Sequence, residues 1–116
     1  MASQGWRTLL HPDCEKELLD LKVENNELLT KVIQDVELLR EFGLELLGRD
    51  RVKKLTDEVF ELRTRRGSNI NRIMFGIKGD RIFLLAASFV KKTQRISPGK
   101  INMAKRRLSE WQGNNG

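Results

Sequence analysis

Basic side chains on predicted strands are the residues whose types and spacing could do chemistry. Arg63 lies on one predicted strand, Arg72 on the next, and Lys91 and Lys92 where a third strand ends. Cations held by rigid strands of one sheet can converge on a single phosphate. Arginine supplies fixed bidentate donors and stays charged, whereas lysine serves as an acid or base only where its surroundings lower its pKa. These four side chains are therefore the candidate catalytic residues.

RNA is a substrate that such a set could cleave, because its own 2′-hydroxyl can attack the adjacent phosphate without a metal. The reaction needs a base for the hydroxyl, an acid for the leaving oxygen and donors for the charge of the pentacoordinate phosphorane. An exposed strand arginine contributes little packing but could hold that charge. We therefore expect Arg72 to be essential for activity and dispensable for folding, and we expect no metal and no cofactor.

The signatures of other enzyme classes are missing from the sequence, which contains no GxxxxGK[ST], GxSxG or HExxH motif. His11 is the only imidazole, and its position beside Pro12 favours a role at the start of a helix. Asp57 and Glu58 are adjacent and would point to opposite faces of a strand, so they make a poor acid/base pair and are better explained by a turn.

A wider set of basic residues is predicted to bind RNA without taking part in cleavage. Lysines and arginines on strands would form its rigid part, and those on the last helix a looser electrostatic stripe. The alternative is that these are ordinary solvated charges, but their origin on successive strands favours a site. The predicted RNA-binding residues are Lys53, Lys54, Arg65, Arg66, Lys105 and Arg106.

The charge of the chain is divided unevenly between its two halves. The 116 residues carry 22 basic and 16 acidic side chains, a net charge of +6. Residues 1–50 hold 6 basic and 11 acidic side chains, a balance of −5, whereas residues 51–116 hold 16 and 5, a balance of +11. The C-terminal half should therefore attract polyanions, and an acidic or amphipathic protein partner could cover it or brace the N-terminal helices.

Local patterns predict an α+β fold in a single domain over residues 1–111, followed by a disordered tail over 112–116. Proline, asparagine and serine mark helix starts, and alternating or continuous apolar runs mark strands. We expect helices packed on one face of an antiparallel sheet of three or four strands, and the basic residues on the other face. The predicted elements are an edge strand at 5–10, a helix at 12–22, a long helix that begins after Asn25 or Asn26 and ends at Gly43 or Gly48, strands at 59–65, 70–77 and 82–90, and a helix at 98–111.

Cysteine content and hydropathy predict a cytoplasmic protein. Cys14 is the only cysteine, so no disulfide can form within the chain, and we expect the protein in a reducing compartment. The longest apolar run, Ile82–Ala87, is far shorter than the roughly 18 residues of a membrane span. Residues 1–11 lack the pattern of a secretory signal. We therefore expect no membrane association.

Four segments resemble, in order and spacing, the RelE/ParE toxin superfamily, and in particular its HigB-like, often phage-derived toxins. The resemblance covers about residues 50–108 well and the N-terminal helices only by pattern. The combination of FVKKTQ with the preceding ELR and RI motifs is fairly specific. The matching segments are Lys53–Leu55 (KKL), Val59–Arg63 (VFELR), Arg72–Phe75 (RIMF) and Phe89–Gln94 (FVKKTQ), with Pro98 following.

This resemblance implies a RelE-like fold and a metal-independent endoribonuclease that cuts mRNA on the ribosome and arrests growth. The implied partners are a cognate antitoxin, the ribosome and mRNA. Arg72 matches the arginine that contacts the scissile phosphate in such toxins, and Arg63 matches a basic position on the neighbouring strand. Lys91 or Lys92 matches the basic residue that closes the next strand, and with no tyrosine in the chain the acid/base work would fall to lysine.

Two other functions fit the same sequence. The ParE branch of the superfamily shares the fold and poisons DNA gyrase without cleaving RNA. A phage-encoded RNA-binding protein without activity is the second alternative. The pattern of Arg72 with Lys91 and Lys92 favours the nuclease over gyrase inhibition.

Overall fold

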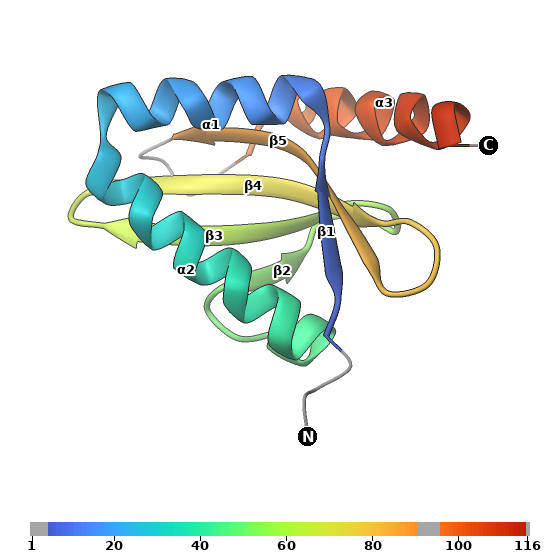
Figure 1. Cartoon of the computed structure of the whole chain (residues 1–116), viewed down its shortest axis with the longest axis horizontal. Helices are drawn as coiled ribbons and strands as arrows, with labels where there is room; N and C mark the ends of the chain where they lie inside the picture. Colours follow the sequence, from blue (N-terminus) through green and yellow to red (C-terminus); the bar gives the residue numbers. More distant parts are fainter. Residues whose placement is uncertain (1–4, 91–95, 116) are drawn as a thin grey trace.

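The computed structural model describes residues 5–90 and 96–115 (Figure 1). Its elements follow the predicted order, with one short strand and one 3-10 helix added between the second long helix and the predicted sheet. They are β1 (Arg7–Leu10), α1 (Pro12–Glu24), α2 (Asn26–Phe42), the 3-10 helix η1 (Gly43–Leu46), β2 (Val52–Lys54), β3 (Phe60–Arg66), β4 (Asn69–Ile77), β5 (Ile82–Val90) and α3 (Pro98–Asn115).

Side-chain caps fix the starts of the helices, as the sequence predicts. The ring Nδ1 of His11 accepts a hydrogen bond from the backbone of Asp13 at the start of α1, 3.0 Å away. Asn25 caps α2 in the same way through its side-chain oxygen. Gly43 ends α2 with a φ of +59°, and a Cβ there would collide with Trp6. The chain can therefore turn out of α2 only at a glycine.

The sheet has five strands in the order β1-β5-β4-β3-β2 and is mixed. Strands β2 to β5 are antiparallel neighbours, which confirms the predicted sheet over 51–90. The N-terminal strand lies at an edge, as expected, but it pairs parallel with β5, so the sheet is not a purely antiparallel meander. A parallel partner is possible because α1 and α2 carry the chain away before the remaining strands form.

Helices cover both faces of this sheet, and the prediction that they share one face is wrong. Helices α1 and α2 pack on one face, whose core contains the six side chains predicted to share an apolar cover: Phe60, Leu62, Ile73, Phe75, Phe83 and Leu85. Helix α3 packs on the opposite face through Ala104 and Leu108 against Met74, Leu84 and Ala87. The apolar residues of β4 and β5 run almost without interruption and so point to both faces, which requires this second cover. Helix α3 therefore occupies much of the face on which the basic residues were expected to lie together.

Helix α3 is attached to α1 and β5 by a buried arginine. The guanidinium of Arg107 donates to the backbone oxygen of Ala86 at 3.0 Å and to the carboxylate of Glu17 at 3.1 Å. Arg107 therefore holds the helix in place and is not part of a basic surface stripe. The backbone of α3 continues to Asn115, beyond the end predicted at 111. Within the described ranges no helix is long and apolar enough to cross a membrane.

Asp35 of α2 is buried, although a charged residue of an amphipathic helix is expected on its solvated face. Its carboxylate accepts hydrogen bonds from Arg51 and from the hydroxyl of Thr64, the latter at 2.7 Å. These contacts join α2 to the C-terminal part of β3 and to the segment that precedes β2. The sequence could not reveal this role because both partners are distant along the chain.

Asp35→Ala is expected to lower the free energy of unfolding by about 1–3 kcal/mol, because Thr64 would keep a buried hydroxyl without its acceptor. Urea unfolding measures the change. Glu37→Ala is the matched control, since within residues 5–90 and 96–115 this exposed carboxylate of the same helix pairs only with exposed Arg40, and it should cost less than about 1 kcal/mol. Equal effects of the two variants would contradict the structural role of Asp35.

Burial raises the pKa of the Cys14 thiol from 9.0 to about 12, and the nearby Glu17 carboxylate adds to this effect. Because the folded pKa lies above the unfolded one, the thiol's contribution to stability is complete below pH 9 and declines as the pH rises toward 12. Between pH 8 and 10.5, wild type should lose about 2 kcal/mol more than Cys14→Ala. Urea unfolding of both proteins at the two pH values tests this, and parallel losses would refute it.

Candidate functional site

Arg72, predicted to be an exposed phosphate ligand, is completely buried. It lies on β4 between β3 and β5, on the face that α3 covers. Its guanidinium donates to the carboxylate of Glu61, which is also buried, at 2.5 Å. The prediction that this arginine is exposed and dispensable for folding is therefore wrong. A central strand covered on both faces leaves its long side chains no path to solvent.

Glu61 lies between two arginines of neighbouring strands. Arg63 and Arg72 occupy directly opposed positions in the β3–β4 pairing. The Glu61 carboxylate approaches Arg63 Nε at 3.7 Å with one oxygen and Arg72 with the other. Two guanidiniums facing each other across a strand pair repel, and a carboxylate between them offsets this repulsion. Glu61 therefore holds both arginines in fixed positions.

Arg63 is the arginine of this group that reaches the surface, where 14% of its side chain is exposed. It lines a cavity of about 440 Å³ between β3, α2 and the segment preceding β2, which we call the β3-edge cleft. Four of its lining residues are basic and two are acidic. They are Lys31, Asp35, Asp50, Arg51, Arg63 and Arg65. Since Asp35 is already bound by Arg51 and Thr64, the cleft offers an excess of cationic donors to an anion.

The cleft exists because β2 is shorter than β3. The pairing of β2 with β3 begins at Lys54 opposite Phe60 and ends at Val52 opposite Leu62. Beyond this pairing, the backbone N–H of Arg63 donates to the backbone carbonyl oxygen of Arg51 at 2.8 Å. In the described part of the chain no strand pairs with the remaining edge of β3. Arg65 lies there, exposed, on the same face as Arg63.

The other predicted RNA-binding residues do not all join this cleft. Lys53 is exposed and opposite Glu61, so it lies on the same face of the sheet. Arg66 instead pairs with Glu27 of α2 at 2.5 Å. The remaining three lie elsewhere: Lys54 lies 4.0 Å from Asp57, Lys105 lines a different cavity, and Arg106 is exposed on α3.

Lys91 and Lys92, the predicted acid/base residues, lie outside the described residues. Both ring nitrogens of His11 make structural contacts. Its Nδ1 accepts a hydrogen bond from the backbone of Asp13, so its Nε2 carries the proton and faces Glu110 at 3.3 Å. Among the residues that the structure describes, no three metal-ligating side chains lie together. What the described side chains of the β3-edge cleft offer to a substrate is a set of cationic hydrogen-bond donors.

Sequence reasoning missed Lys31, Arg51 and Glu61. Lys31 and Arg51 enter the cleft from α2 and from the segment before β2, and no local pattern predicts that they approach Arg63. Glu61 could have been found: it lies two residues before Arg63 on the same strand, so both side chains point to one face. A carboxylate among arginines on a covered face predicts a buried ion pair.

Comparison with known proteins identifies the family of the chain. The model of the family described as Phage derived protein Gp49-like (DUF891) matches residues 16–109, from α1 into the last turns of α3. No curated protein matches the chain. The family's phage origin is compatible with a toxin of the HigB-like kind. Because the match spans most of the domain, including β3 and its cleft, the chain belongs to the phage-derived Gp49-like family.

Proposed function

We propose that this protein is the toxin of a bacterial toxin–antitoxin module and an endoribonuclease that cuts mRNA on the ribosome. The observation that carries the proposal is the β3-edge cleft, where Arg63 and Arg65 of one strand meet Lys31 and Arg51. Such a set of donors suits a phosphate that gains negative charge in the transition state. Membership of a phage-derived family and the resemblance of the FVKKTQ segment to HigB-like toxins support the same function.

In the proposed reaction the 2′-oxygen of a ribose attacks the adjacent phosphorus. The bond between O2′ and phosphorus forms, and the bond between phosphorus and O5′ breaks. The products are a 2′,3′-cyclic phosphate and a free 5′-hydroxyl. A base takes the proton of the 2′-hydroxyl, and an acid gives one to the departing O5′. Arg63 and Arg65 would stabilise the phosphorane oxygens, and Lys91 or Lys92 is the proposed proton carrier.

Arg72 and Glu61 act in this proposal as positioning residues. Neither is exposed, so neither can touch RNA in this conformation. The Glu61 carboxylate limits the rotation of the Arg63 side chain, with 3.7 Å between Glu61 Oε1 and Arg63 Nε. A donor that is already oriented loses less entropy when phosphate binds and is more effective in the transition state.

The proposal is tested by inducible expression in bacteria followed by mapping of mRNA ends. Growth arrest with new ends inside coding sequences supports the nuclease. Arrest with intact mRNA and gyrase-linked DNA breaks would overturn it in favour of gyrase inhibition. Growth without arrest would overturn it in favour of an inactive RNA-binding protein.

Co-expression of the neighbouring gene is expected to restore growth, because a toxin of this kind must be held inactive by an antitoxin. We expect the antitoxin to present acidic side chains to the basic part of the sheet, around Lys53, Arg63 and Arg65. Co-purification at low and high salt measures the complex, which should weaken as salt screens these charges. A neighbouring gene product that neither binds nor rescues would refute the module.

A further inference from the structure

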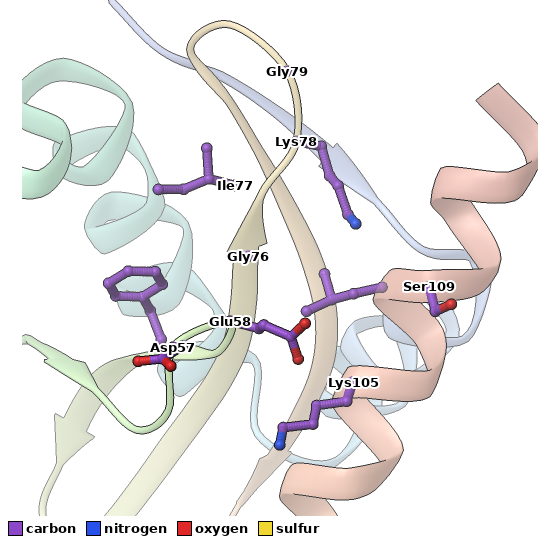
Figure 2. Close-up of a pocket in the computed structure, with 10 residues that line it drawn as sticks. Asp57, Glu58, Gly76, Ile77, Lys78, Gly79, Lys105 and Ser109 are labelled. Carbon is purple, nitrogen blue, oxygen red and sulfur yellow. The ribbon is translucent and has the colours of Figure 1, made fainter. Parts of the chain in front are cut away.

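A second cavity, of about 450 Å³, lies between the segment preceding β3, the β4–β5 connection and α3 (Figure 2). It shares no lining residue with the β3-edge cleft. We call it the α3 pocket and define it by the six lining residues Glu58, Gly76, Lys78, Lys105, Leu108 and Ser109. Of these, only Lys105 belongs to the set predicted to bind RNA.

The polar groups of the α3 pocket are of both charges. Figure 2 shows the Glu58 carboxylate between the ammonium groups of Lys78 and Lys105 in that view, with the Ser109 hydroxyl on the helix beside them. Both lysines are half-buried, and Glu58 is exposed. In the described ranges, no hydrogen bond or ion pair engages the Glu58 carboxylate or the Lys105 ammonium. The pocket thus presents an acceptor and a cation that are both available to a ligand.

The floor of the α3 pocket is apolar and closely packed. A Cβ on Gly76 would lie 2.9 Å from Leu108 Cδ1 and 3.1 Å from the backbone oxygen of Glu58. A glycine therefore lets β4, the segment before β3 and α3 approach this closely without displacing the Leu108 side chain. Gly76, which has no side chain, and the Leu108 methyl groups leave an apolar floor against which the face of a planar ring can pack.

We propose that the α3 pocket binds one unstacked ribonucleotide whose base carries an exocyclic amino group. Glu58 accepts a hydrogen bond from the amino group, as a carboxylate does from cytosine N4. Lys105, whose ammonium group is available, binds the phosphate, and the base lies on the Gly76–Leu108 floor. The cavity is within the size range of small-ligand sites. This inference rests on the proposed function, because it makes the pocket a subsite for the RNA that is cleaved.

The position of the pocket along β3 fits this role. Phe60 at the start of β3 lines the pocket, and Arg65 near its end lines the β3-edge cleft. From Phe60 to Arg65 the chain advances by five residues, which in an extended strand span about 17 Å. One single-stranded RNA that follows β3 can therefore occupy both sites, so the pocket would select a base a few nucleotides away from the cleaved bond.

Titration of the full chain with CMP and UMP, followed by amide chemical shifts, tests the α3 pocket without any cleavage. CMP should shift the amides of Gly76, Lys78 and Ser109 and bind at least about tenfold more tightly than UMP, which lacks the amino group. Glu58→Gln should remove this preference, because an amide can bond to either base. Lys105→Ala should weaken both ligands alike, whereas Lys16→Ala, on the exposed side of α1, should leave both affinities unchanged.

Equal affinity for CMP and UMP in wild type, or shifts confined to other regions, would overturn the α3 pocket as a base site. If the protein nevertheless cleaves mRNA, the proposed function stands and only this inference fails. If CMP binds as expected but no mRNA is cleaved, the pocket assignment stands and the nuclease is overturned. The two failures are therefore distinguishable.

Discussion

Arg72→Ala is expected to lower the free energy of unfolding by about 3–5 kcal/mol, because Glu61 would remain buried without its principal partner. This result differs from that expected for an exposed phosphate ligand, whose loss would leave stability nearly unchanged. Urea unfolding followed by circular dichroism measures it. Glu61→Ala should be destabilising to a similar degree, since it leaves Arg63 and Arg72 opposed with no carboxylate between them.

A double variant without charge at positions 61 and 72 distinguishes the loss of the ion pair from the loss of packing. The double variant with Arg72→Met and Glu61→Leu removes both charges and keeps most of the volume, so it should be more stable than either alanine variant. An Arg72→Ala protein that is as stable as wild type yet inactive would contradict the structural role and restore Arg72 as a phosphate ligand.

Arg63→Ala is expected to reduce the rate of mRNA cleavage by roughly 10²–10³ and to abolish growth arrest, because one fixed donor to the phosphorane is lost. Its stability should fall less than that of Arg72→Ala, since Glu61 keeps Arg72 as its partner. Single-turnover cleavage and urea unfolding of the same preparation separate the two effects.

Arg66→Ala is the matched control for Arg63→Ala. It is an arginine on the same strand, but it is tied to Glu27 and does not line the β3-edge cleft. It should retain cleavage within a few-fold of wild type. If Arg66→Ala and Arg63→Ala lose activity equally, the positive charge of β3 as a whole matters and the cleft does not.

Much of the fold could be predicted because it is encoded locally. Proline and asparagine mark the helix starts at Pro12 and Asn25, and the Gly67 turn separates β3 from β4, with a φ of +63° at Gly67. The apolar alternation of Phe60 and Leu62 identifies the face that α1 and α2 cover. Each of these signals depends on residues within a few positions of one another.

The candidate site could be predicted only in part because it depends on contacts between distant segments. The strand pattern identifies Arg63 and Arg65 as candidates, and in the structure both line the β3-edge cleft. The burial of Arg72 follows from the placement of α3 on the second face of the sheet, which no local pattern determines. Lys31 and Arg51 reach the cleft through the packing of α2 on β3 and the short length of β2.

Cleavage of mRNA on programmed ribosomes by the purified protein tests the central claim most directly. We predict that wild type cuts the message within a single turnover and leaves a 2′,3′-cyclic phosphate and a 5′-hydroxyl at the new ends, and that Arg63→Ala does not. An intact message with the folded wild-type protein, or equal cleavage by Arg63→Ala, would contradict the assignment of the β3-edge cleft as the site of RNA cleavage.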